Sequence, residues 1–230
     1  MNGSEGFVTI DGNTTATVNY CGLQRLSQQG HIDILPKRSF DLFFSVIGLV
    51  IFLPLLFMIA LVVLITLGWP VLYSAQRTGL SGCLFTMRKF RTMKIVDGPT
   101  SHHSGDDDPR ISKTGRWIRK FKFDELPQLW NIAKGEMSFV GPRPESPDYT
   151  RLYTKEQLEI LQLRPGITDF ASIEFHDLGS ILVGDDPDKL YFEKVWDKKM
   201  NLRMKYVREH SFFLDLKLIF LTFSTILYRK

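Results

Sequence analysis

The chain has 230 residues, of which 44% are hydrophobic and 23% charged, a balance that is ordinary for a globular domain with its own core. Its net charge of +4 and its pI near 9 suit a nucleic acid, an anionic lipid surface or a phosphate-bearing substrate, so charge alone does not choose among these partners. The two cysteines, Cys21 and Cys83, form no CxxC pair or metal spacing, which argues against a disulfide framework and indicates a reducing compartment.

The first 73 residues divide into a polar tail and an apolar segment. Residues 1–36 mix Gly, Ser, Thr, Asn and Gln with little periodicity, so we expect a flexible N-terminal tail there. Residues 37–73 follow, and no charged residue occurs from Leu42 to Gln76. The apolar run begins too late and is too long for a cleavable signal peptide, so we predict a membrane segment that stays in the mature protein.

Pro54 lies near the middle of this apolar run. Proline removes a backbone hydrogen bond and clashes with the preceding turn, so we expect two half-helices, each about 18–20 Å long. Neither half spans a hydrocarbon core of about 30 Å. Basic residues flank both ends, with Lys37 and Arg38 before the run and Arg77 and Arg88 after it, which favours a re-entrant helix, break, helix wedge. A proline-kinked single span is the alternative from hydropathy alone.

Residues 74–230 are predicted to form a cytoplasmic domain of the α+β class, mainly helical. Two short strands at 71–75 and 83–93 flank a turn-rich stretch at 78–82, which predicts a β-hairpin. The polar loop at 97–109 contains five side chains of metal-binding types: His102, His103, Asp106, Asp107 and Asp108. Successive residues of a flexible loop seldom converge on one ion, so we interpret this loop as solvated.

The second half of the domain is predicted to be helical with short extended pieces. A basic helix over 113–122 precedes a helix over 125–133, which ends at Gly135 because glycine suits the position after a helix. The next elements are an extended piece at 138–140, a rigid stretch at 141–145, a helix at 154–163, a turn at 164–166 and a charged helical pattern at 186–208. This last pattern fits either a homodimer contact or the domain surface. The apolar stretch 212–223, interrupted by Asp215 and Lys217, predicts either an interfacial helix or a helix packed on the domain.

Asp124 is the most informative charged residue of the domain. Pro127 follows it, a pattern typical of a helix N-cap with proline in the first turn. A helix start also attracts phosphoryl groups, so the same residue is a candidate nucleophile. Arg116 and Arg119 share one face of the preceding helix, where they are either phosphate ligands or solvated or lipid-facing residues. Arg143 stands between two prolines, which present its bidentate guanidinium group stiffly.

Five motifs occur in order from about residue 37 to the C-terminus. They are Lys37-Arg38 with Asp41, Arg88-Lys89-Phe90-Arg91-Thr92-Met93, Asp124-Glu125-Leu126-Pro127-Gln128-Leu129, Gly141-Pro142-Arg143-Pro144-Glu145 and Arg164-Pro165-Gly166-Ile167-Thr168. Each motif is weak evidence by itself. Together they resemble the motifs of the bacterial sugar transferases called monotopic polyprenyl-phosphate phosphoglycosyl transferases.

The resemblance implies transfer of a sugar 1-phosphate from a nucleotide diphosphate sugar, expected to be a UDP-sugar, to polyprenyl (undecaprenyl) phosphate. The reaction would pass through a covalent aspartyl phosphosugar intermediate with Mg2+ as cofactor. It would be the first membrane step of polysaccharide or glycoconjugate assembly, at the cytoplasmic face of the bacterial inner (cytoplasmic) membrane. Two alternatives are a structural scaffold of that assembly and a membrane-tethered nucleic-acid-binding module; the second would explain the basic pI, but the chain lacks a recognisable nucleic-acid-binding pattern.

By the same resemblance, the nucleophile falls on Asp124, which is also the expected metal ligand. Its partner carboxylate falls on Glu125, the strand lysine on Lys89 and the phosphate-proximal arginine on Arg119. Four residues are assigned to substrate binding, namely Arg143, Gln128, Arg116 and Arg164. Pro54 marks the membrane break.

The sequence departs from the family pattern at two places. Leu53 precedes Pro54 where a small polar residue is common in the family, and Asp169-Phe170-Ala171-Ser172 replaces the usual Gly-Trp-Ala-Gln-like continuation. The second departure leaves the sugar undefined. The amino-terminal spans of larger relatives are missing from this sequence, so it resembles the minimal catalytic unit.

Overall fold

The first two strands pair within the segment that we expected to be a flexible tail. The structure is a computed structural model that describes residues 6–10, 14–18, 31–96 and 103–227; β1 (Gly6–Ile10) and β2 (Thr14–Val18) form an antiparallel hairpin. The prediction of a flexible tail is therefore wrong for these strands. Threonine and valine recur in both strands, and β-branched residues favour strands even where hydrophobic periodicity is weak. Cys21 and His102 lie outside the described residues.

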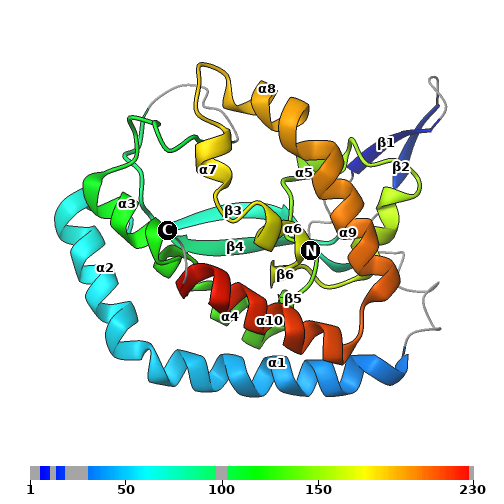
Figure 1. Cartoon of the computed structure of the whole chain (residues 1–230), viewed down its shortest axis with the longest axis horizontal. Coiled ribbons are helices and arrows are strands. Elements are labelled where there is room, and N and C mark those ends of the chain that lie inside the picture. The colour runs from blue at the N-terminus through cyan, green and yellow to red at the C-terminus, as the bar shows by residue number, and fades with distance from the viewer. Residues whose placement is uncertain (1–5, 11–13, 19–30, 97–102, 228–230) are drawn as a thin grey trace.

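Helices α1 (His31–Ile51) and α2 (Leu53–Leu67) form the predicted helix, break, helix segment. α1 begins before the predicted boundary at residue 37, because hydropathy and charge mark the apolar run and not the helix start. The two helices bend by 61° at the break. Pro54 has no N–H for the carbonyl of Val50, and the bend follows from this missing hydrogen bond. Figure 1 shows α1 along the lower edge of the molecule and α2 rising at its left side.

Within the described ranges, no single helix has the length and apolar character needed to cross a membrane. The bent pair Leu35–Ile51 and Leu53–Leu67 has the length and composition of either a broken span or a re-entrant loop. α2 buries Ile59 and Val63, which pack against Phe90 and Ile118. Many of its other large apolar side chains are exposed, so much of the surface of α2 is apolar.

Two small sheets occupy the centre of the domain. β3 (Leu72–Thr78) and β4 (Leu84–Phe90) form the predicted antiparallel hairpin, and β3 starts just before the expected domain boundary at residue 74. β5 (Ser138–Val140) pairs in parallel with β6 (Gly166–Thr168), which sequence reasoning treated as part of a turn. Pairing partners so far apart in the chain leave no local signal, which explains why this sheet was missed.

The segment between β4 and β5 contains three helical pieces. α3 (Lys113–Lys120) confirms the basic helix and begins at an N-cap, where the Ser112 hydroxyl accepts the Gly115 N–H at 2.8 Å. A 3-10 turn (Phe123–Glu125) follows, and α4 (Gln128–Lys134) ends at Gly135, whose φ of 83° confirms the predicted C′ position.

The helices between β5 and α10 cover the upper part and the right side of the domain in Figure 1. They are α5 (Pro147–Thr150), a 3-10 helix (Gln157–Gln162), α6 (Phe170–Glu174), α7 (Leu178–Ile181), α8 (Pro187–Tyr191), a π-helical turn (Phe192–Trp196) and α9 (Asp197–Glu209). The helix predicted at 154–163 is therefore shorter and of the 3-10 type, starting at a reciprocal pair of hydrogen bonds between Thr154 and Gln157 and ending before Pro165. The helical pattern predicted at 186–208 is confirmed as three consecutive helical segments.

Helix α10 (Phe212–Leu227) is the apolar stretch for which the sequence left two alternatives, an interfacial helix or a helix packed on the domain. Leu218 is fully buried beside Val140 and Tyr206, so α10 packs on the domain. Phe213 and Phe220 are 83% and 73% exposed, so other parts of the same helix present an apolar surface. The observed architecture is the expected mainly helical α+β fold.

Candidate active site

Glu125 is the meeting point of two cationic side chains. Lys89, near the end of β4, donates from Nζ to Glu125 Oε1 at 2.9 Å. Arg143 contacts both oxygens of the same carboxylate, with Nη1 lying 3.2 Å from Oε2 and Nη2 bonded to Oε1. Residues from β4, from the 3-10 turn and from the Gly-Pro-Arg-Pro-Glu stretch therefore converge, and these are three of the side chains that the family resemblance assigned to the site.

The surroundings of Glu125 decide what its carboxylate can do. Burial raises the pKa of Glu125, but Arg143 and Lys89 outweigh burial and hold the pKa well below its ordinary value. Burial lowers the pKa of Lys89, and Glu125 partly opposes this. A carboxylate with such a low pKa is a poor proton acceptor at neutral pH. The arrangement favours Glu125 as the group that holds Lys89 and Arg143 in place.

Asp124 is not the N-cap that we predicted. It lies inside the 3-10 turn, while α4 begins at Gln128 with Pro127 at the cap position and no side-chain cap bond. The main-chain bonds from Glu125 N to the Lys122 carbonyl and from Leu126 N to the Phe123 carbonyl continue the turn through this residue. An aspartate followed by a proline three residues later occurs both at a helix N-cap and in a 3-10 turn, so the sequence pattern did not distinguish the two structures.

The carboxylate of Asp124 is buried and incompletely bonded. The residue is 8% exposed, and Oδ1 has no hydrogen-bond partner among the described residues. Burial raises the pKa of Asp124, while Lys89 and Arg119 act in the opposite direction. Since it caps no helix, this carboxylate has an oxygen free for a ligand or for chemistry.

Arg119, near the end of α3, and Gln128, at the start of α4, lie on either side of the 3-10 turn in the chain. Arg119 Nε donates to Thr92 Oγ1 at 2.9 Å, and Arg119 and Asp124 each shift the pKa of the other in the direction expected for opposite charges. Gln128 is 1% exposed, and neither its Oε1 nor its Nε2 has a hydrogen-bond partner in the described part of the chain. A buried amide normally finds partners, so Gln128 fits its predicted role as a substrate-binding residue.

Two other predicted substrate-binding residues are placed differently. Arg164 Nε donates to the carbonyl of Gly135 at 3.1 Å, next to Arg38, which donates to the Ile132 and Ala133 carbonyls at 2.7 and 2.8 Å. Both arginines bond the C-terminal end of α4, and substrate binding by Arg164 stays a prediction. Arg116 is exposed, and its side chain makes no hydrogen bond or ion pair with the described residues.

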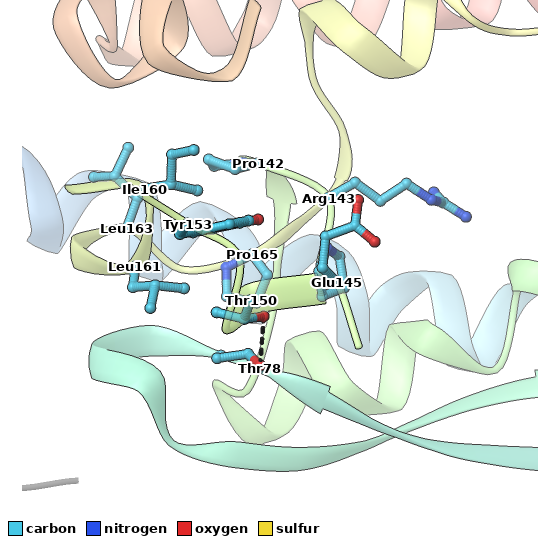
Figure 2. A pocket seen from close by; sticks show the side chains of 12 residues that line it. Thr78, Pro142, Arg143, Glu145, Thr150, Tyr153, Ile160, Leu161, Leu163 and Pro165 are labelled. Carbon is cyan, nitrogen blue, oxygen red and sulfur yellow. Dashed lines mark hydrogen bonds between the residues drawn. The ribbon is translucent and has the colours of Figure 1, made fainter. Parts of the chain in front are cut away.

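The contact between Asp169 and the segment around Arg143 was not predicted from the sequence. Asp169 is fully buried, and its Oδ2 accepts the backbone N–H of Arg143 at 3.2 Å. Its Oδ1 accepts the Ser172 N–H at 2.6 Å and thereby caps α6. The cap pattern before Phe170 was a usable local signal, whereas the contact with Arg143 depends on the tertiary fold. Figure 2 shows the guanidinium of Arg143 pointing away from a small pocket lined by Thr78, Thr150 and Tyr153.

The loop at 97–109 was expected to be solvated, and this is wrong for His103. Its ring stacks on Tyr191 with centroids 3.7 Å apart, and its Nδ1 lies 2.9 Å from Asp188 Oδ1. Asp108 pairs with Arg110 at 2.6 Å, while Asp106 and Asp107 are exposed. The aromatic and ionic partners of His103 are on α8, and they could not be inferred from the loop itself.

A magnesium ion was expected at Asp124. Among the described residues, no group of three or more His, Cys, Asp or Glu side chains is placed to hold a metal by itself. Mg2+ is commonly bound through one or two carboxylates together with substrate phosphates. The free oxygen of Asp124 fits that manner of binding, whereas Arg143 and Lys89 already occupy the carboxylate of Glu125.

Comparisons with known proteins agree on one family. The family described as bacterial sugar transferase matches residues 32–229. The uncharacterized sugar transferase EpsL of Bacillus subtilis is 39% identical over 83% of this chain and 87% of its own length. The exopolysaccharide production protein ExoY of Rhizobium meliloti is 32% identical over 84% of this chain and 85% of its own. UDP-glucose:undecaprenyl-phosphate glucose-1-phosphate transferase of Escherichia coli is 33% identical over 83% of this chain, which spans 40% of that longer protein.

Proposed function

The chain belongs to the bacterial sugar transferase family, and we propose that it transfers a sugar 1-phosphate from a UDP-sugar to undecaprenyl phosphate. The observation that carries this proposal is the buried carboxylate oxygen of Asp124 that has no hydrogen-bond partner among the described residues. Asp124 interacts electrostatically with Arg119 and lies beside the Lys89, Glu125 and Arg143 cluster. Carboxylates that act as nucleophiles toward phosphorus need an unbonded oxygen and nearby positive charge.

In the proposed first step, an oxygen of Asp124 attacks the β-phosphorus of the donor. The phosphorus–oxygen bond to the nucleoside monophosphate breaks, and the electron pair leaves with that product. In the second step, a phosphate oxygen of undecaprenyl phosphate attacks the same phosphorus, and the bond to Asp124 breaks. The carboxylate is restored, and undecaprenyl diphosphate sugar is formed without any further reactant.

The cationic side chains have separate parts in this scheme. Arg119 and Lys89 stabilise the charge that develops on the transferred phosphoryl group. Glu125 holds Lys89 and Arg143 in place and orients them, and Arg143 contributes positive charge to the binding of the nucleotide diphosphate. Gln128 offers an amide to the donor. Mg2+, held at Asp124 and the substrate phosphates, would supply further countercharge when bound.

We also propose that α1 and α2 enter the cytoplasmic membrane as a re-entrant wedge, with the domain on the cytoplasmic face. Support comes from both ends of the wedge. At the start, Lys37 Nζ donates to the Val140 carbonyl at 2.8 Å. At the end, Arg91 donates to the Leu67 and Gly68 carbonyls at 2.5 and 2.7 Å. One domain thus holds both ends of the apolar segment, whereas a straight span would place them about 30 Å apart, on opposite sides of the membrane.

The proposed function is tested on the full chain in lipid nanodiscs, incubated with UDP-glucose and other UDP-sugars without lipid acceptor. We expect intact-protein mass spectrometry to detect a phosphosugar on the wild type and none on Asp124→Asn. Asp107→Asn, at an exposed acidic position, is the control and should be labelled like the wild type. A folded Asp124→Asn variant that still transfers sugar phosphate to undecaprenyl phosphate at the wild-type rate would exclude the nucleophile.

A further inference from the structure

A second buried ionic cluster lies behind Arg143. Its four members, Glu145, Asp169, Lys199 and Arg203, are 9%, 0%, 8% and 0% exposed. Within the described residues none of them has a hydrogen bond or ion pair with Asp124 or Glu125, so the reaction scheme leaves their role open. Burying four ionisable groups is costly unless each is paired. The presence of this cluster therefore calls for a physical reason.

Glu145 gathers two cations from one face of α9. Its Oε1 lies 2.9 Å from Lys199 Nζ and 2.9 Å from Arg203 Nη2, and it accepts the hydroxyl of Tyr191 at 3.0 Å. Burial raises the pKa of Glu145, but Lys199 and Arg203 outweigh it and hold the pKa far below its ordinary value. Glu145 is therefore charged and firmly bound to α9.

Arg203 differs from Lys199 because it also reaches Asp169. Its Nε lies 3.9 Å from Asp169 Oδ2, the same oxygen that accepts the Arg143 N–H at 3.2 Å. Arg203 thus forms ion pairs with two carboxylates, of which Asp169 is bonded to the backbone of Arg143 and Glu145 lies two residues farther along the chain. The contact with Asp169 is electrostatic, because 3.9 Å is beyond hydrogen-bond distance, and the Nη1 of Arg203 donates to the Tyr153 hydroxyl at 3.2 Å. Lys199, one helical turn earlier, has an ion pair with Glu145 alone.

The Arg143 segment is stiff enough to transmit these contacts. Pro142 and Pro144 restrict the backbone on both sides of Arg143. Gly141 N donates to the Thr168 carbonyl at 3.0 Å, which fixes the start of the segment on β6. Figure 2 shows the Arg143 guanidinium extending away from Pro142 and Tyr153.

We propose that Arg203 is a positioning residue for the transferase reaction: by binding Glu145 and Asp169 together, it holds the segment that aims Arg143 at the donor diphosphate. This inference rests on the proposed function. Arg203 touches no substrate in this scheme and acts only through the two carboxylates. Arginine suits the task because its charge is spread over a planar group, so that Nη2 faces Glu145 while Nε faces Asp169, whereas lysine carries its charge on a single ammonium.

The test compares Arg203→Met with Lys199→Met in the full chain in nanodiscs, because each removes one buried positive charge from the same helix. With UDP-glucose or the most active UDP-sugar and undecaprenyl phosphate, we expect Arg203→Met to lower kcat/KM for the donor by about 10-fold to 100-fold. Lys199→Met should stay near the wild-type value while losing thermal stability. Equal losses of kcat/KM in both variants would overturn the inference, since they would indicate a general effect of disturbing the buried cluster.

A double-mutant cycle with Arg143→Lys distinguishes an effect that acts through Arg143 from general structural damage. If Arg203 acts through Arg143, Arg203→Met should cost little further kcat/KM once Arg143 is already replaced. If the two substitutions lower kcat/KM by independent factors, so that the double variant shows the product of the two, the inference is contradicted. Arg203→Lys, which keeps the charge and loses the fork, gives the same comparison if Arg203→Met does not fold.

Hydrogen exchange of residues 141–145 separates this inference from the proposed function, because it needs no substrate. We expect faster exchange of this segment in Arg203→Met than in Lys199→Met, and equal exchange would overturn the positioning role. A wild type that transfers sugar phosphate from none of the UDP-sugars would overturn the proposed function, while the exchange comparison would still decide whether Arg203 holds the segment.

Discussion

Lys89 Nζ lies 2.9 Å from Glu125 Oε1, and Arg143 binds the same carboxylate. A single buried negative charge therefore holds together two cations that would otherwise repel each other. The side chains of Lys89 and Glu125 are 20% and 11% exposed, so the attraction between them is only weakly screened by solvent. The adjacent acidic residues 124 and 125 consequently have different surroundings, since Asp124 Oδ1 has no hydrogen-bond partner among the described residues and Glu125 is bonded to two cations.

Glu125→Gln should destabilise the fold and weaken donor binding together. The amide keeps the size of the side chain but leaves Lys89 and Arg143 without a countercharge. We expect the free energy of unfolding to fall by about 3 kcal/mol, with a higher KM for the donor, measured by chemical denaturation and steady-state kinetics. Glu156→Gln, which breaks an exposed pair with Arg208, is the control and should cost less than about 1 kcal/mol.

The role of Glu125 as a holder of cations has a further consequence. Lys89→Met should cost less kcat/KM in the Glu125→Gln background than in the wild type, because the amide variant has already released the lysine. A general base would behave differently. If Glu125→Gln removed one limb of the pH profile of kcat and left both stability and KM unchanged, Glu125 would be a proton acceptor instead.

Gly166→Ala should disturb the Arg143 segment through the backbone. A Cβ at Gly166 would lie 2.1 Å from the nitrogen and 2.6 Å from the oxygen of Gly141, so β5 and β6 would have to separate. We expect a loss of about 1–3 kcal/mol in the free energy of unfolding, together with reduced transfer activity. Gly48→Ala, whose Cβ would meet only the flexible side chain of Leu129 at 3.3 Å, is the matched control. Wild-type activity of Gly166→Ala would show that β5 and β6 do not need this close approach.

Sequence reasoning succeeded where the relevant signal was local. The bend before Pro54, the hairpin of β3 and β4 and the end of α4 at Gly135 each depend on residues within a few positions of the feature. A proline that lacks an N–H or a glycine with positive φ has the same effect in any fold. These elements could therefore be predicted without knowledge of the tertiary structure.

The errors concern features that distant residues decide. Asp124 was expected to cap a helix, but the turn continues through it. The hydrogen bond from Arg164 to the Gly135 carbonyl was not predicted either. The partners of Arg203 are contributed by segments 34 and 58 residues away from it, counting 203 − 169 and 203 − 145. No local pattern records such pairings, because each depends on how the helices pack.

His103 should make stability depend on pH in the mildly acidic range. Burial lowers the pKa of His103 below its ordinary value of about 6.5, although Asp188 opposes this. The unfolded chain then binds a proton more readily than the folded protein, so the free energy of unfolding falls as pH decreases through 6.5 toward the lowered pKa. The other charged groups that influence His103 are Glu145 and Lys199, and Tyr149 and Tyr191 contact its ring.

The check is a set of melting curves between neutral pH and pH 5 for the wild type and for His103→Gln. We expect the wild type to lose more stability on acidification, because the glutamine variant has no proton to bind at this position. His176→Gln, at an exposed histidine, is the control and should follow the wild type. Parallel curves for wild type and His103→Gln would show that protonation of His103 does not couple to folding.

Lys37→Met should loosen the attachment of α1 to the domain. Lys37 is joined to the buried carboxylate of Asp215 on α10, to the Val140 carbonyl at 2.8 Å and to the Tyr206 hydroxyl at 3.5 Å. Removing the cation leaves Asp215 with the Tyr206 hydroxyl at 2.6 Å as a neutral partner, so the protein should lose about 1–3 kcal/mol of stability. In an Asp215→Asn background the same change should cost less, because no buried charge is left unpaired. The measurement is thermal unfolding of all four proteins in the same nanodiscs, and equal costs of Lys37→Met in both backgrounds would mean that this ion pair does not hold α1 to the domain.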